Sequence, residues 1–231
     1  MLNDFFFGAY PYIAGTIFFI GSWMRYDREQ YTWKADSSQF LQNDIKMRMA
    51  SNMFHVGIIA VFFGHLVGLL TPHSWFLALG VSDLAHQWVA IIAGVVFGGL
   101  CCAGAVMLLM RRLNEPRVSA VSRPRDTFVI GWLLATVTIG LLTVIVSVQH
   151  ASHGDASTMI ALSQWVQSVA TLSVDASLLN GVSFIYKLHM VFGMTVFLVF
   201  PFTRLVHVWS VPVSYLGRAY QVVRTKKSQF N

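Results

Sequence analysis

The stretch Ser51–His73 reads SNMFHVGIIAVFFGHLVGLLTPH and contains no Asp, Glu, Lys or Arg. An α-helix needs about 20 predominantly apolar residues to cross the hydrocarbon core of a bilayer, and this stretch is long enough. Its apolar core nevertheless carries two ionisable side chains, His55 and His65, and His73 ends the stretch. The stretch therefore predicts a membrane-spanning helix with two polar groups that need a partner inside the membrane.

The rest of the chain has the same character. Its 231 residues are 55% hydrophobic and 11% charged, with a mean hydropathy of +0.60, which excludes an ordinary soluble domain. Backbone N–H and C=O groups in lipid must form hydrogen bonds with each other, which favours helices over open sheet. We predict an all-α integral membrane protein, a single membrane domain over residues 1–231 with five transmembrane helices. The approximate spans are 5–24, 50–71, 87–110, 127–149 and 182–206.

Lysine and arginine predict the direction of insertion, because short basic loops stay in the cytoplasm. Counted along the segments between the spans, these residues number 0, 5, 0, 5, 1 and 5. The N-terminus is therefore expected outside, on the periplasmic face, and the C-terminus in the cytoplasm, with residues 207–231 as a basic tail. The segments counted are 1–4, 25–48, 72–86, 111–126, 150–187 and 204–231.

The basic residues flank apolar runs, which argues against a nucleic-acid partner despite a calculated isoelectric point of 9.6. The tail either binds anionic membrane lipid or an acidic partner, or is a solvated topology signal. The adjacent Cys101 and Cys102 are read as packing residues. Residues 156–172 are expected to form a surface helix with an apolar face toward the membrane, made of Met159, Ile160, Leu162, Trp165, Val166 and Val169.

Four histidines fall inside the second and fifth spans, two in each: His55, His65, His189 and His207. Spacings of 18 residues in the fifth span and 10 in the second keep each pair on one face of a continuous helix. The two spans run in opposite directions, so His55 and His207 are expected near the cytoplasm and His65 and His189 nearer the outside. Two facing imidazoles can hold a haem iron from both sides.

The rises of the two helices do not match, being about 15 Å between the histidines of one and about 27 Å in the other. Different tilts and a break at Pro201 are expected to absorb part of this difference. Glycines beside the histidines either admit a flat macrocycle or make helix contacts; they are Gly57, Gly64, Gly68 and Gly193. Arg204 either pairs with a haem propionate or extends to the cytoplasmic interface.

Long motifs then indicate a family. The chain resembles, nearly end to end, the gamma subunit of bacterial membrane-bound respiratory nitrate reductase, a di-haem cytochrome b. The motifs are Tyr10–Tyr26 (YPYIAGTIFFIGSWMRY), Ser51–His73 quoted above, and Phe200–Tyr215 (FPFTRLVHVWSVPVSY). The resemblance implies four axial iron ligands on the same histidines, with His55 and His207 on an inner haem and His65 and His189 on an outer haem.

The resemblance also implies an activity and partners. Such a subunit lies in the bacterial inner membrane and oxidises menaquinol or ubiquinol near the outer haem, releasing protons outside. Its electrons pass to the iron–sulfur beta subunit in the cytoplasm, and then to the molybdenum-containing alpha subunit that reduces nitrate.

The quinol is expected at the outer ends of the second and third spans, with His86, His65 and Gly68 as candidate site residues. The loop from Thr71 to Gln87 holds no lysine or arginine, and its His73, Trp75, Phe76 and His86 offer aromatic walls with two polar groups. The resemblance implies a lysine at this point of the quinol site, where this chain places His86. The alternative is that Trp75 and Trp88 are interfacial anchors and His86 is a solvated loop residue.

Three other functions compete with this interpretation. One is the cytochrome b subunit of another quinone-linked enzyme, of the formate dehydrogenase, hydrogenase or succinate dehydrogenase type, which its catalytic partner would distinguish. Another is a transporter that uses histidines for protons or metal, which would favour carboxylates in the apolar cores of the spans. A third is a non-catalytic anchor, which leaves the four histidines unexplained.

Overall fold

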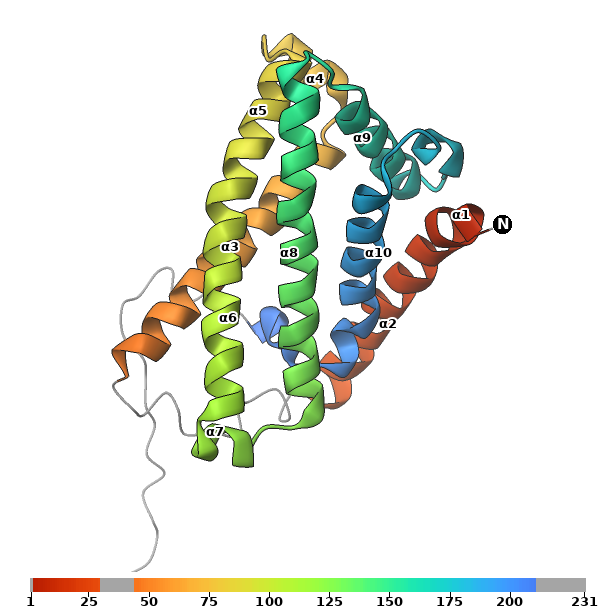
Figure 1. Cartoon of the computed structure of the whole chain (residues 1–231). Coiled ribbons are helices and arrows are strands. Elements are labelled where there is room, and N and C mark those ends of the chain that lie inside the picture. Colours follow the sequence, from red (N-terminus) through yellow and green to blue (C-terminus); the bar gives the residue numbers. More distant parts are fainter. Residues whose placement is uncertain (1, 30–43, 211–231) are drawn as a thin grey trace, which may run out of the picture.

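The computed structural model describes residues 2–29 and 44–210, and every regular element in these ranges is helical (Figure 1). The prediction of an all-α protein is confirmed for this part of the chain. The elements η1 and η4 are π-helical turns within longer helices, while η5, η6 and η7 are 3₁₀-helical. In chain order they are α1 (Leu2–Asp4), η1 (Phe5–Ala9), α2 (Tyr10–Arg28), α3 (Ile45–Leu70), α4 (His73–Ala78), α5 (Asp83–Ala93), η4 (Gly94–Gly98), α6 (Gly99–Asn114), α7 (Pro116–Ala120), α8 (Pro124–Ser152), α9 (Ser157–Ala170), η5 (Ala176–Leu179), α10 (Phe184–Val199), η6 (Phe200–Phe202) and η7 (Arg204–Ser210).

Five helices within the described residues are long and apolar enough to cross a membrane, as predicted. Polar side chains satisfy free backbone groups at the start of two of them. Asp44 accepts hydrogen bonds from the N–H groups of Lys46 and Met47 at the start of α3, and Ser82 accepts one at the start of α5. The five are Leu2–Arg28, Ile45–Leu70, Asp83–Asn114, Pro124–Ser152 and Phe184–Phe202.

Helices α3 and α6 pack with their backbones in contact. A Cβ added at Gly57 would lie 2.7 Å from Cα of Cys101, and one at Gly104 would lie 2.4 Å from the backbone nitrogen of Phe54. Only glycine fits such a contact. Gly57 therefore serves helix packing rather than the approach of a macrocycle, and Cys101 is buried in the seam, as a packing residue.

The remaining helices of the bundle pack side by side, each against the next. Helix α6 packs on α8, α8 on α10 and α10 on α2, while α3 and α10 do not pack closely against each other in the described part (Figure 1). We call one end of the bundle the basic end; it carries α7 and the side chains of Arg111, Arg112, Arg123 and Arg204. The opposite end carries α4 and α9, and we call it the α9 end.

A small apolar core closes the α9 end, made by Phe7, Trp165, Leu179, Val182 and Tyr186. Helix α9 forms where the sequence predicted it, but its apolar face does not point to the membrane. Trp165 is only 5% exposed and its indole N–H donates to the carbonyl of Phe7 over 3.0 Å. The prediction about this face was wrong, because α9 covers the ends of other helices and packs its apolar side chains against them.

The fifth span breaks at Pro201, as predicted. Proline has no N–H for the helical ladder, and α10 ends at Val199. The chain continues through η6, turns at Thr203 in an extended conformation, and enters η7. On the neighbouring helix α2, Arg25 Nη1 donates to the carbonyl of Pro201 over 2.8 Å. The predicted span 182–206 therefore consists of a shorter helix and two 3₁₀ turns.

Candidate functional site

The four intramembrane histidines meet as two pairs across the gap between α3 and the α10–η7 segment. Toward the basic end, the ring centres of His55 and His207 lie 6.3 Å apart with an interplanar angle of 75°. Toward the α9 end, those of His65 and His189 lie 6.0 Å apart at 45°. Two imidazoles bound on opposite sides of one metal ion, with metal–nitrogen bonds of about 2 Å, have centres about 6 Å apart. Both pairs therefore have a spacing that fits iron held by two histidines.

The break after Val199 explains how both pairs form despite the unequal spacing in sequence. From His189 to Val199 the helix rises by about 15 Å, the same rise as from His55 to His65. The chain then leaves the axis of α10, and η7 brings His207 back toward α3. The argument that 18 residues make whole turns of one helix was wrong, because no continuous helix joins His189 to His207.

Each of the four histidines uses its Nδ1 atom for a hydrogen bond to a backbone carbonyl. The bonds of His55 to Ser51, His65 to Val61 and His189 to Thr136 measure 2.7, 2.8 and 3.1 Å, and His207 bonds to the carbonyl of Arg204. A carbonyl oxygen only accepts, so Nδ1 carries the proton and the lone pair is on Nε2. This arrangement is the usual one for a metal-binding histidine.

The hydrogen bond alone does not identify a ligand. His153, at the end of α8, makes the same bond to the carbonyl of Gln149 over 2.7 Å, because any histidine in a helix can reach the preceding turn. What distinguishes the four is that each faces another imidazole at metal-binding distance.

Helix α8 supports the pair toward the α9 end through two residues that the sequence did not single out. Thr136 supplies the carbonyl that orients His189, and a Cβ at Gly140 would lie 2.8 Å from Cε1 of the same ring. Glycine at 140 therefore makes room for His189. Nothing in the sequence indicated that α8 touches this ring.

The other glycines near the histidines fit a flat group in different ways. A Cβ at Gly64 or Gly193 would meet no atom within 4 Å, and Gly193 lies one helical turn after His189. A Cβ at Gly68 would lie 3.5 Å from Nε2 of His86. The open space at Gly193 is what a macrocycle beside the His189 ring needs, whereas the Gly68 position lies beside His86 on the helix that carries His65.

His86 lies in the protein at the α9 end rather than in an open loop. Its ring stacks on Phe76 with centres 4.1 Å apart, and His73 Nδ1 lies 2.9 Å from Oδ1 of Asp83 beside it. A small cavity of about 20 Å³ adjoins them, lined by His73, Phe76, His86, Met159, Ile160, Ser163, Gln164 and Gln167. This space holds about one water molecule and not a quinol ring.

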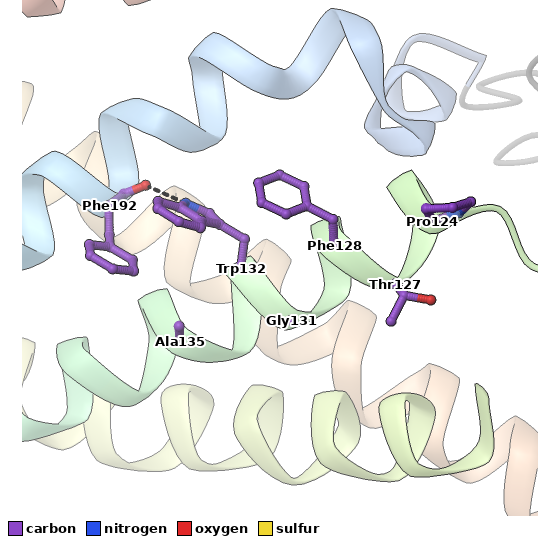
Figure 2. Close-up of a pocket in the computed structure, with 7 residues that line it drawn as sticks. All are labelled: Pro124, Thr127, Phe128, Gly131, Trp132, Ala135 and Phe192. Carbon is purple, nitrogen blue, oxygen red and sulfur yellow. Dashed lines mark hydrogen bonds between the residues drawn. The ribbon is translucent and has the colours of Figure 1, made fainter. Parts of the chain in front are cut away.

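A larger hollow of about 610 Å³ lies elsewhere, on α8 and α10 (Figure 2). Trp132 and Phe192 stack there with centres 4.3 Å apart, and the indole of Trp132 donates to the carbonyl of Phe192. Its lining contains no ionisable side chain: Pro124, Thr127, Phe128, Gly131, Trp132, Ala135 and Phe192. The hollow is wide open and offers no group for proton or electron chemistry, so the histidine pairs remain the candidate site.

Comparison with known families shows to which of them this chain is similar. The family described as "Nitrate reductase gamma subunit" matches residues 3–226. The chain belongs to this family. It is 50% identical to the respiratory nitrate reductase 1 gamma chain of Escherichia coli K12, over 97% of this chain and 98% of that one. It is 48% identical to the respiratory nitrate reductase 2 gamma chain of the same strain, over 98% of both. The nitrate reductase gamma chain of Bacillus subtilis 168 is 35% identical over 98% of this chain and all of its own length.

Membership of the nitrate reductase gamma subunit family makes the chain one subunit of an enzyme complex, together with other nitrate reductase subunits. The five apolar helices agree with a multi-pass protein of the inner membrane. The resemblance inferred from the motifs is thus confirmed over nearly the whole sequence.

Proposed function

We propose that this chain oxidises membrane quinol, either menaquinol or ubiquinol, and passes the electrons to the cytoplasmic iron–sulfur beta subunit of a respiratory nitrate reductase. Nitrate reduction itself takes place on the molybdenum-containing alpha subunit. The observation that carries the proposal is the presence of two histidine pairs, each with the ring spacing of a metal held by two imidazoles.

Two b haems are the proposed cofactors, bound without covalent attachment because the sequence has no Cys-x-x-Cys-His motif. His55 and His207 hold the inner haem, and His65 and His189 hold the outer haem. When bound, the haems supply one-electron transfer. Because two histidines would hold each iron, neither site would bind oxygen or nitrate at iron. Arg204 is the proposed partner of a propionate of the inner haem.

The basic end is proposed to face the cytoplasm and the N-terminus the outside, following the distribution of lysine and arginine. Most of the basic tail, residues 211–231, lies outside the described residues. This orientation places the inner pair next to a cytoplasmic partner. Quinol oxidation at the α9 end then releases protons outside while electrons move inward.

The quinol site is proposed beside the outer pair, with His86 as hydrogen-bond partner and proton acceptor, and with Gly68 and His65 next to it. The support is that His86 lies beside Gly68: a Cβ at position 68 would be 3.5 Å from Nε2 of His86. Because the cavity at His86 is small, a quinol ring requires Phe76 or α9 to move aside. A neutral imidazole can accept a quinol proton as the electrons leave.

Replacing His86 with alanine tests this role in the assembled complex. We expect quinol-dependent haem reduction to slow by roughly 100-fold, the usual scale for removal of an acid–base group, with both haems still bound. Reduction is followed by stopped-flow absorbance after addition of a menaquinol analogue. His153→Ala is the matched control, since His153 lies at the end of α8 outside the pairs. Unchanged reduction in His86→Ala would remove His86 from the site.

A further inference from the structure

Asp126 is a carboxylate buried at the basic end, and its burial needs an explanation. It is the third residue of α8, and the N–H of Arg123 donates to its Oδ2 over 3.2 Å, which caps the helix. Capping carboxylates normally remain in water. The side chain of Asp126 is only 1% exposed, and a charge removed from water to this extent requires charged partners.

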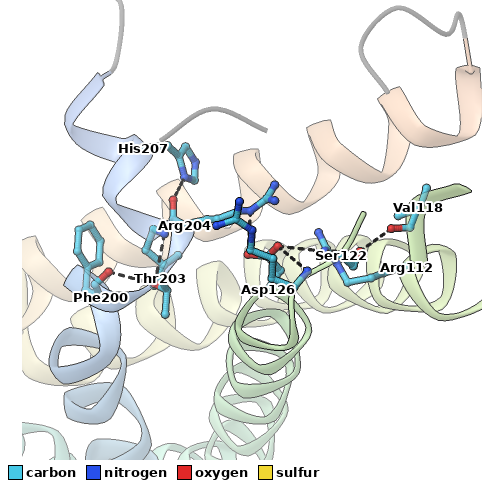
Figure 3. A network of polar contacts seen from close by, with 10 residues as sticks. Arg112, Val118, Ser122, Asp126, Phe200, Thr203, Arg204 and His207 are labelled. Carbon is cyan, nitrogen blue, oxygen red and sulfur yellow. Dashed lines mark hydrogen bonds and ion pairs between the residues drawn. The ribbon is translucent and has the colours of Figure 1, made fainter. Parts of the chain in front are cut away.

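Two arginines from different segments supply those partners (Figure 3). Nε of Arg204, the first residue of η7, lies 2.8 Å from Asp126 Oδ1, and Nη1 of Arg112, near the end of α6, lies 3.8 Å from Oδ2. Arg112 also donates to the hydroxyl of Ser122 over 2.8 Å. The carboxylate thus joins α6, α8 and η7 at one point.

The same residue, Arg204, orients the inner histidine. Its carbonyl accepts the hydrogen bond from Nδ1 of His207. The helical ladder is interrupted at Pro201, so η7 is not held in line by α10. Buried Val206 and the ring contact between Trp209 and Phe18 fix η7 by apolar packing, and Asp126 fixes the residue that bonds His207.

The charges of Asp126, Arg112 and Arg204 would also affect the reduction potential of a nearby haem iron. Replacing Asp126 with asparagine would remove one negative charge beside the two guanidinium groups, so the net charge of this region would become more positive by one unit. More positive charge favours the reduced form of a nearby iron, because that form is the less positive one.

We propose that Asp126 is a positioning residue of the inner haem site: through Arg204 it fixes the orientation of His207, and it lowers the positive charge around the inner haem. This inference rests on the proposed function, since it assumes iron between His55 and His207. It assigns to Asp126 an effect on one haem and not on the other.

The test is a potentiometric titration of the two haems in the membrane-bound complex, combined with electron paramagnetic resonance of their oxidised forms. In Asp126→Asn we expect the inner haem to shift to higher potential with altered g values, and the outer haem to be unchanged. Asp126→Glu keeps the charge and should restore the inner haem toward its original potential. Selective loss of the inner haem in Asp126→Asn would also support the proposal.

Asp44→Asn is the control, because Asp44 forms a longer and more exposed ion pair with Arg111, over 3.4 Å, at the same end without a bond to the segment of His207. It should shift neither haem. If Asp126→Asn does not assemble, Arg112→Gln replaces it; this variant removes the other arginine that pairs with Asp126 and should lower the potential of the inner haem alone. An unchanged inner haem, or equal shifts of both haems, would overturn the proposal. Absence of haem from the unsubstituted complex would instead reject the proposed function.

Discussion

Replacing His189 with alanine is expected to remove the outer haem and leave the inner haem in place, and replacing His65 should remove the same haem. Each histidine of this pair faces the other at 6.0 Å between ring centres. Changes to groups that only orient a ligand cost about 10–100-fold in metal affinity, so loss of the ligand itself should cost more. Quinol-dependent reduction of the remaining haem should fall by at least the same factor.

Reduced-minus-oxidised absorbance spectra at low temperature distinguish the two haems in these variants. The matched control is His153→Ala, because His153 makes the same kind of hydrogen bond to a backbone carbonyl but does not face another histidine in the described part of the chain. The pairing is wrong if His65→Ala and His189→Ala remove different spectral components, or if His65→Ala and His55→Ala remove the same one.

Replacing His55 or His207 should have the opposite effect, loss of the inner haem with the outer haem retained. Quinol should still reduce the outer haem. Electron delivery to the partner subunits and nitrate reduction should fall by about 100-fold or more, because loss of a ligand should cost more than the roughly 10–100-fold that loss of an orienting group costs. The reason is position: this pair lies at the basic end, between the outer pair and the proposed cytoplasmic partner.

Two assays on the same membranes separate these effects. One follows haem reduction by a quinol analogue, and the other follows nitrate reduction with quinol as donor. A variant of His55 that retains quinol-driven nitrate reduction without an inner haem would contradict the proposed order of the two sites.

The helices of this protein could be predicted from the sequence because hydrocarbon imposes a simple rule. Uncharged runs of about 20 residues have to form helices, and their ends follow from the nearest charged or capping residue, as at Asp44 and Ser82. The four histidines could also be found, since an ionisable side chain inside such a run is unusual. Their pairing followed from the opposite directions of two spans.

The supporting residues could not be predicted, because they depend on contacts between segments far apart in the chain. Gly140 matters only because the ring of His189 crosses to α8, and Asp126 only because η7 folds back to it. The prediction that His189 and His207 lie on one face of a helix was also wrong. It assumed a continuous helix, whereas the helix is interrupted at Pro201. The apolar face of α9 had the pattern of a membrane-surface helix but covers protein.

The most direct test of the account is the haem content of the purified complex. Extracted haem, quantified as its pyridine complex, is divided by the amount of this chain determined by amino-acid analysis. The account predicts two b haems for each chain, one for each histidine pair. A value of one or zero in an intact, folded complex would contradict it.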